Sequence, residues 1–142
     1  MKAKGLITKL LVIGIIIAVI FAGWLFDYER SKKYSITITE ISNENPVASN
    51  KERVEITFFV AKNGVPCAGH EVEIRADAGT FQSGQIGYTD ENGEITFCYV
   101  PYNESKYKEA GDVNFLVIDL SNSVFVEVNA EMRFTLTLRS KQ

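Results

Sequence analysis

The chain has 142 residues, of which 46% are hydrophobic, and it carries a net charge of −3 at pH 7. This length allows one domain with a short attached segment, and the acidic balance argues against a nucleic-acid backbone as partner, because such a partner needs a basic surface. With one histidine and two cysteines, the composition predicts no metal site, no cofactor and no catalytic residue set.

Residues 10–26 form an uninterrupted apolar run, LLVIGIIIAVIFAGWLF. These 17 residues are close to the minimum for a helix that crosses a bilayer at a rise of about 1.5 Å per residue. Leu6 and Ile7 lengthen the apolar face by one turn if the Thr8 hydroxyl bonds back to the helix backbone. The run therefore predicts a transmembrane helix that holds the chain in a lipid bilayer, with Trp24 at the outer interface.

Two other interpretations of residues 10–26 remain open. The basic start and the small residues Ala22 and Gly23 fit a cleaved signal peptide, although Ile20 stands where such a peptide prefers a small residue. A buried core helix is the second alternative, but a β protein of this size has little room for a helix that is apolar on all sides. We therefore expect a retained anchor.

The basic residues do not orient the helix by their number, since three lie on each side of it within a few residues. The free amino terminus and the closeness of Lys9 to the apolar run favour an N-terminus inside the cell. All 18 acidic and 12 of the 15 basic residues follow the run, which leaves the later part at −6. The predicted organisation is a single-pass cell-membrane protein with an extracytoplasmic β domain: a short cytoplasmic segment 1–9, a helix 10–26, a connector 27–33 and the domain 34–142.

Apolar and polar residues alternate in most of the remaining chain, with the period of two that is typical of half-buried strands. The alternating segments are 34–41, 54–60, 72–76, 95–99 and 113–120, with a short edge strand near 86–89. Asn63-Gly64 and Asp90-Glu91-Asn92-Gly93 are turn sequences between them. About seven short strands, with no helical pattern after the anchor, predict an all-β antiparallel sandwich.

Two segments are unusual. In 113–120 both faces are apolar, so the face with Leu116, Ile118 and Leu120 is either covered core or a surface for a protein partner in the envelope. Residues 124–138 alternate without a turn residue, and as one strand they would span about 50 Å, well beyond a usual strand. This segment is expected either to bend near Asn129-Ala130 and pass from one sheet to the other, or to overhang the domain with its end.

Three further sets of side chains are candidates for a role. Cys67 and Cys98 can form one disulfide outside the cell, or else pack as two small hydrophobic side chains. Tyr102 and Tyr107 can stack on a sugar, although loop tyrosines usually pack on the rim of a sandwich. His70 follows a glycine in a turn and is expected to be an exposed polar residue without a catalytic partner.

The turn residues of the predicted domain resemble those of bacterial immunoglobulin-like domains of the invasin and intimin kind. The motifs are Asn63-Gly64-x-Pro66-x-x-Gly69-x-x-Val72-x-Ile74, Gly79-Thr80-Phe81 and Thr89-Asp90-x-x-Gly93-x-Ile95. The resemblance covers residues 35–118 and rests on turns, which specify a fold more than an activity. It implies an Ig-like sandwich that acts as a non-catalytic structural or binding module at a prokaryotic cell surface. The chain differs from this family in having one domain instead of a tandem array, and a longer final strand region.

A second resemblance concerns the N-terminus, where Lys4-Gly5-Leu6 before a long apolar stretch is similar to a type IV prepilin cleavage site. Bacterial pilins usually carry a glutamate shortly after the cut, which this chain lacks, and the helix is expected to end near Tyr28, early for a pilin stem. The predicted function is therefore a membrane-anchored structural or interaction subunit of a cell-envelope assembly, in adhesion or as an accessory. A pilin-like subunit with a sandwich head and a membrane-tethered carbohydrate-binding module are the alternatives.

Overall fold

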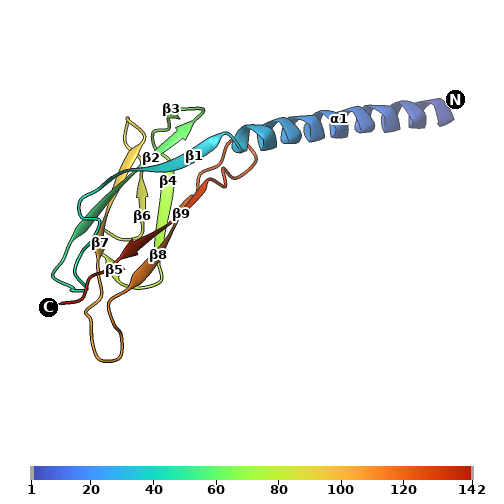
Figure 1. Cartoon of the computed structure of the whole chain (residues 1–142). Helices are drawn as coiled ribbons and strands as arrows, with labels where there is room; N and C mark the ends of the chain where they lie inside the picture. The colour runs from blue at the N-terminus through green and yellow to red at the C-terminus, as the bar shows by residue number, and fades with distance from the viewer. Residues whose placement is uncertain (1, 142) are drawn as a thin grey trace.

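The computed structural model describes residues 2–141 and consists of one long helix followed by a two-layered β-sandwich (Figure 1). The elements are α1 (Lys2–Ser31), β1 (Tyr34–Ile41), β2 (Val54–Lys62), β3 (Val65–Pro66), β4 (Glu71–Ala76), β5 (Thr80–Phe81), β6 (Ile86–Tyr88), β7 (Glu94–Val100), β8 (Asp112–Asp119) and β9 (Glu131–Thr137). One sheet has the order β1-β2-β7-β5 with β3 beside β2, and the other has the order β6-β4-β8-β9. All of these strand pairs are antiparallel, which confirms the predicted sandwich.

Helix α1 is longer than its apolar run because nothing breaks it before Ser31. The Thr8 hydroxyl donates to the Lys4 carbonyl at 3.0 Å, as expected for a polar residue within an apolar helix. At the other end the Lys33 N–H donates to the Arg30 carbonyl at 3.2 Å and closes the last turn. The helix therefore does not end near Tyr28, and the predicted connector is reduced to a turn of two residues, Lys32 and Lys33.

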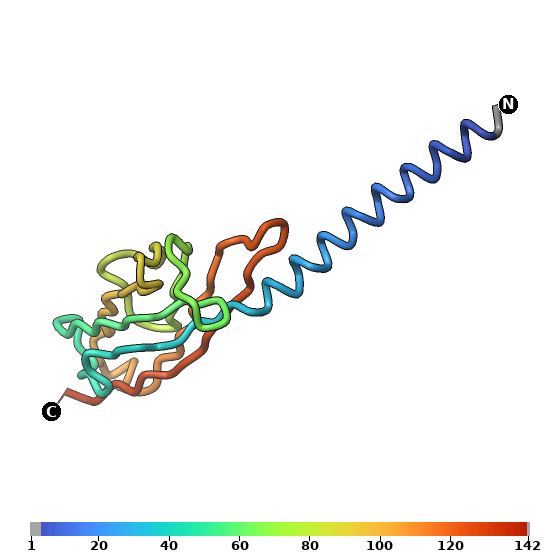
Figure 2. The backbone as a smooth tube through the Cα atoms, turned by 90° about the horizontal axis from the view of Figure 1, so that it is seen from above, coloured from blue at the N-terminus to red at the C-terminus, as the bar shows by residue number. Residues whose placement is uncertain are grey.

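The apolar side chains of α1 do not pack into the sandwich. Every residue of the run 10–26 is exposed, and α1 leads away from the β layers (Figures 1 and 2). Between Lys4 and Ser31 it is long and apolar enough to cross a membrane, judged by length and composition. The alternative of a buried core helix is therefore wrong for this fold.

The core lies between the two sheets and is formed by the inward side chains of the alternating strands. On β2 these are the predicted Val54, Ile56, Phe58 and Val60, all fully buried. Tyr99 on β7 is also fully buried, and its hydroxyl donates to the Ala78 carbonyl at 2.8 Å. Its ring contacts those of Phe81 and Phe115, and these continue into a cluster with Phe97, Phe134 and Phe58.

Residues 124–138 alternate throughout but do not form one continuous strand. Strand β9 begins only at Glu131, because Asn129 has φ of +52°, a left-handed conformation that interrupts an extended chain. Residues 120–130 instead form a loop, here called the β8–β9 loop, which extends from the sandwich beside the end of α1 (Figure 2). The bend is therefore at the expected position, but the residues before it form this loop and do not pass into the other sheet.

Of the two alternatives for Cys67 and Cys98, the structure has free thiols and no disulfide. The Cys67 N–H donates to the Val60 carbonyl at 3.0 Å, whereas Cys98 pairs with Glu55 in the β2–β7 register. Val60 and Glu55 are five residues apart on one strand, which places the two cysteines about 16 Å apart along β2. A disulfide needs Cα atoms within about 7 Å, so this fold keeps the thiols separate.

The close approach of Gly79 to the Tyr99 ring allows the packing of the core to be tested by substitution. Gly79 has φ of +86°, and a Cβ at this position would lie 2.5 Å from the Tyr99 hydroxyl oxygen. We expect Gly79→Ala to lower the free energy of unfolding by about 3 kcal/mol, because it combines an unfavourable backbone with a clash against a buried ring. Gly84 also has φ of +86° but open space around it, so Gly84→Ala should cost about 1 kcal/mol. Equal losses for the two variants in chemical denaturation would contradict the packing described for Tyr99.

Candidate functional site

The Asp27 carboxylate joins the end of α1 to the tip of the β8–β9 loop. Its Oδ1 accepts a hydrogen bond from the Ser123 hydroxyl at 2.6 Å. Its Oδ2 accepts three consecutive backbone N–H groups, from Val124 at 3.1 Å, Phe125 at 2.7 Å and Val126 at 3.0 Å. The Asp27 residue is only 3% exposed, so these four donors take the place of water around the charge.

The same contacts decide the charge state of Asp27, which is the first residue after the apolar run. The Ser123 hydroxyl and the three backbone N–H groups stabilise the carboxylate and lower its pKa to about 2, against the opposing effect of burial. The charged form accepts shorter and stronger hydrogen bonds than a neutral acid does. Asp27 is therefore ionised at neutral pH and holds the loop tip as an anion.

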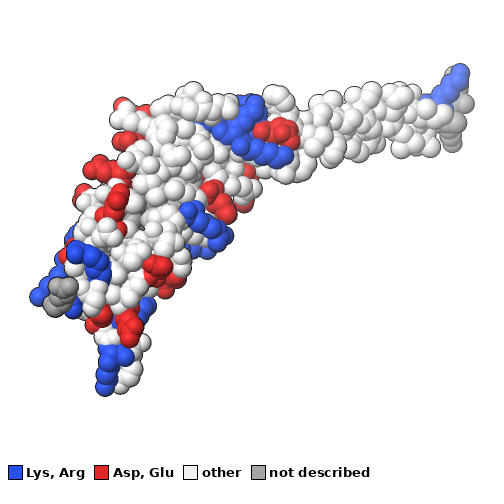
Figure 3. All heavy atoms as spheres, viewed as in Figure 1, with Lys and Arg blue, Asp and Glu red and all other residues white. Residues whose placement is uncertain are grey.

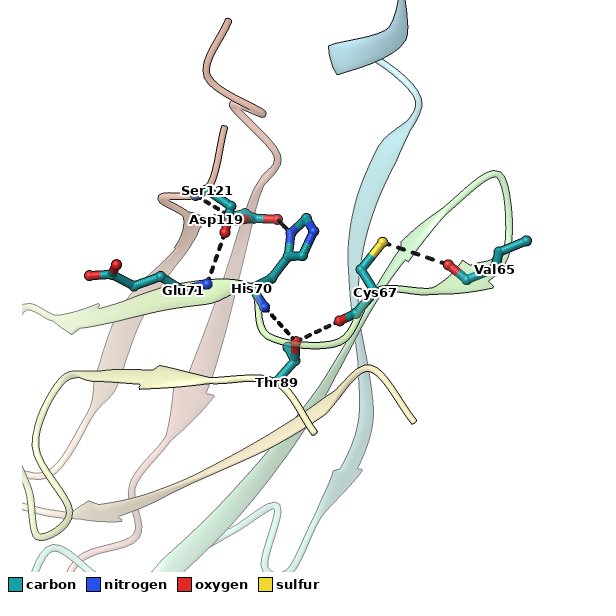
Figure 4. Close-up of polar contacts among 7 residues, drawn as sticks. All are labelled: Val65, Cys67, His70, Glu71, Thr89, Asp119 and Ser121. Carbon is teal, nitrogen blue, oxygen red and sulfur yellow. Dashed lines mark hydrogen bonds and ion pairs between the residues drawn. The ribbon is translucent and has the colours of Figure 1, made fainter. Parts of the chain in front are cut away.

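The base of the β8–β9 loop is held by a second buried carboxylate, Asp119 at the end of β8 (Figure 4). Its side chain is fully buried, with Oδ2 lying 2.6 Å from Nδ1 of His70 and Oδ1 accepting the Ser121 N–H at 2.9 Å. The Ser121 hydroxyl oxygen in turn accepts the Glu71 N–H at 2.9 Å. The start of the loop is thereby fixed to strand β4, and His70, with 16% of its side chain exposed, is not the exposed residue that we expected.

The neighbouring hydroxyl and thiol are occupied by structural hydrogen bonds (Figure 4). The Thr89 hydroxyl donates to the Cys67 carbonyl at 2.5 Å and its oxygen accepts the His70 N–H at 2.9 Å. The Cys67 thiol donates to the Val65 carbonyl at 3.7 Å, and burial raises the pKa of this thiol, which disfavours the nucleophilic thiolate. Across residues 2–141 no group of three or more His, Cys, Asp or Glu side chains is placed to hold a metal ion. This cluster therefore links the turn before β4 to the end of β8, where the loop begins.

The tip of the β8–β9 loop presents apolar side chains beside the helix. Val124 is 61% exposed and Phe125 is 76% exposed. An apolar groove between the two elements is lined by Val19, Ile20, Gly23, Trp24 and Phe125. The loop thus extends the apolar surface of α1 instead of packing it away.

The predicted interaction face on β8 lies on the outer surface of its sheet. Leu116 and Ile118 are half-buried, and Leu120, just after the strand, is 40% exposed. Their cross-strand neighbours on β4 and β9 are arginines beside Leu116 and glutamates beside Ile118: Arg75, Arg133, Glu73 and Glu131. Contact with a partner through this face stays a prediction.

The two tyrosines predicted for sugar stacking are arranged differently from each other. The Tyr102 hydroxyl donates to the Glu109 carbonyl at 2.8 Å and its ring packs on the core, with the Lys108 ammonium 4.3 Å from the ring centroid. Tyr107 is 86% exposed, with the Lys106 ammonium 4.8 Å from its ring centroid. A cation thus lies near both rings, and sugar stacking there stays a prediction.

The sequence interpretation did not single out Asp27 or Ser123. Their contact joins positions 96 residues apart, so no local pattern reveals it. The available signal was a lone aspartate directly after an apolar run, where a charge is costly unless it has partners.

No protein-family model matches the sequence, and no curated protein matches it significantly. Solved structures do share its fold. The D0-D1 domains of intimin are 23% identical over 73% of this chain and 49% of that one, with a TM-score of 0.52. The D00-D0 domains of intimin are 19% identical over 72% of this chain and 46% of that one, with a TM-score of 0.54.

A third similar structure is a C-terminal 282-residue fragment of intimin in complex with the intimin-binding domain of the translocated intimin receptor. It is 19% identical over 72% of this chain and 33% of that one, with a TM-score of 0.52. The chain therefore spans about half or less of the length of these three structures. The sandwich has the fold of the bacterial immunoglobulin-like domains of intimin, which confirms the resemblance inferred from its turns.

The bonds to Asp27 predict that Asp27→Asn loosens the loop tip. The amide keeps the shape of the side chain but loses the charge that strengthens four hydrogen bonds, so the N–H groups of residues 124–126 should exchange with solvent about tenfold faster. Hydrogen exchange of the detergent-solubilised chain measures this effect.

Glu29→Gln is the matched control, because Glu29 makes an exposed pair with Lys32 at 2.9 Å and does not hold the loop. This control should leave the exchange of residues 124–126 unchanged. Unchanged exchange in Asp27→Asn would contradict the role assigned to the carboxylate.

Proposed function

We propose that the chain is a non-catalytic, membrane-anchored Ig-like module in which residues 10–26 cross the bilayer and the sandwich lies on the extracytoplasmic side. The observation that carries this proposal is the exposed apolar helix, whose surface has no partner within the sandwich and is long enough to span. Trp24 and Tyr28 stack with their rings 5.6 Å apart at the end of the run, where aromatic side chains suit a membrane interface.

A retained anchor is favoured over a cleaved signal peptide by the groove beside the loop. Cleavage near Ala22 and Gly23 would remove Val19 and Ile20, which line this groove with Phe125. Phe125 would then lose the apolar surface next to it. The structure of the loop is thus consistent with a helix that stays on the mature chain.

We further propose that the module acts as a structural or interaction subunit of a cell-envelope assembly. Support comes from the fold, since one of the similar solved structures is an intimin fragment bound to its translocated receptor. The face proposed to bind a protein partner is that of Leu116, Ile118 and Leu120, where apolar side chains alternate with paired charges on neighbouring strands. No enzymatic role is proposed, because His70 is used to hold Asp119.

Topology gives the direct test of the anchor. Protease added to intact cells should digest the sandwich, residues 34–142, and leave the helix in the membrane fraction. The reason is that an N-terminus-inside helix places everything after residue 26 outside. A sandwich that stays fully protected until the cells are lysed would contradict the proposal.

The partner face is tested with Ile118→Asp and crosslinking in intact cells. A buried charge at the centre of an interface should reduce the crosslinked product at least about tenfold, the effect of a hot-spot residue. Val65→Asp is the matched control, because Val65 is 65% exposed on β3 in the other sheet. If Ile118→Asp unfolds the domain, the face is ordinary core. If both folded variants keep the product, the face does not bind the partner.

A further inference from the structure

The β8–β9 loop carries an apolar tip on a hydrogen-bonded stem with polar side chains. Asn122 and Glu127 face each other across the stem as a bridge, and the Ser123 N–H donates to the Val126 carbonyl at 2.8 Å. Beyond this stem the Val124 and Phe125 side chains are mostly exposed. Two adjacent large apolar side chains that are exposed at a loop tip are typical of a surface that contacts a partner or a membrane.

Phe125 lies beside the part of α1 that is predicted to be in the membrane. Phe125 shares its groove with residues between Val19 and Trp24, inside the apolar run. At about 1.5 Å per residue, those positions lie about 5 to 12 Å from Asp27 toward the N-terminus. If the run crosses a bilayer, the Phe125 ring lies beside the helix at the depth of acyl chains.

The backbone N–H groups of the tip have hydrogen-bond partners within the protein, as a position in lipid requires. In hydrocarbon no water is available to N–H groups, so each must bond within the protein. The three consecutive N–H groups at the tip, from Val124 to Val126, all donate to Asp27. An exposed loop in water would not require this, because solvent satisfies such groups at no cost.

Basic side chains at the end of α1 lie where lipid headgroups would be if the run crosses a bilayer. Lys and Arg side chains gather around an acidic side chain where α1 meets the sandwich (Figure 3), and Glu29 pairs there with Lys32 at 2.9 Å. The basic side chains include Arg30 and Lys32, whose cationic groups lie 5.7 Å and 4.2 Å from the rings of Phe26 and Tyr28. Basic groups at this level favour lipid phosphates, so the apolar tip and the cations follow the order of a bilayer surface.

We propose that the tip of the β8–β9 loop, Val124 and Phe125, inserts into the outer leaflet beside α1 and forms a second contact between the sandwich and the lipid. This inference rests on the proposed function, since it requires residues 10–26 to span the bilayer. The occupant of the groove is then lipid acyl chain. Two points of attachment, joined by Asp27, set the orientation of the sandwich on the membrane.

Tryptophan quenching tests the insertion in the full chain. The probe is Phe125→Trp in a Trp24→Phe background, reconstituted in phosphatidylcholine vesicles in which part of the lipid carries a doxyl quencher high on the acyl chain. Its emission should fall about as much as that of native Trp24 in the unmodified chain, and aqueous iodide should not quench it. Val124→Trp in the same background is a second, independent probe.

Tyr107→Trp in the same background is the control, because Tyr107 is 86% exposed on the loop between β7 and β8, which lies away from the helix (Figure 1). Iodide should quench this probe and the doxyl lipid should not. Doxyl quenching of both tip probes, with the control unaffected, is the result that we expect.

Two results would overturn the insertion while the anchor remains. Quenching of the tip probes by iodide alone would place the tip in water. Protection from both quenchers would place it against protein, as with the helix of a partner. Native Trp24 that the doxyl lipid does not quench would instead reject the spanning helix, and with it the proposed function.

Discussion

The arrangement of the whole chain depends on one ionised side chain. Asp27 comes directly after the apolar run and accepts four hydrogen bonds from a loop that lies almost a hundred residues later in the sequence. Without it, the helix and the sandwich would be joined mainly by the turn at Lys32 and Lys33, since no residue from Leu10 to Phe26 is buried. Because a carboxylate removed from water is costly until its hydrogen bonds are satisfied, the bound loop and the charge stabilise each other.

The sandwich provides the rigid support for this contact. Its aromatic core holds β8 and β9 in one sheet, and the fully buried Asp119 fixes the point at which the chain leaves β8. The Asp119 carboxylate pairs with Nδ1 of His70 and accepts a hydrogen bond from the Ser121 N–H. The Ser121 hydroxyl oxygen accepts the Glu71 N–H from β4. The β8–β9 loop is thus held at its base by one buried acid and at its tip by another. An Ig-like fold with such a loop can hold a helix at a defined angle, which a flexible linker cannot do.

Much of the fold could be predicted from the sequence because its signals are local. Strand β1 was predicted with both ends, since strict alternation and a polar loop after it leave little choice. Alternation was misleading over residues 124–128, where Val124, Val126 and Val128 mimic a strand although only Val128 is buried in the core and the tip is turned toward α1. Periodicity does not show which apolar surface a residue faces. The pairs Asp27–Ser123 and His70–Asp119, at separations of 96 and 49 residues, leave no local trace either. The sequence left a disulfide between Cys67 and Cys98 open, because it does not show that Cys67 lies beside Val60 and Cys98 beside Glu55 of β2.

The hydrogen bonds of Asp27 predict that the helix and the sandwich form one rigid unit. Pulsed electron paramagnetic resonance tests it most directly in the chain reconstituted in lipid nanodiscs. Spin labels are attached at Ile16→Cys in α1 and Glu91→Cys in the turn before β7, after the native Cys67 and Cys98 are replaced by serine. We predict a single narrow distance distribution between the two labels. A broad distribution, as produced by a free hinge at Lys32 and Lys33, would contradict the account.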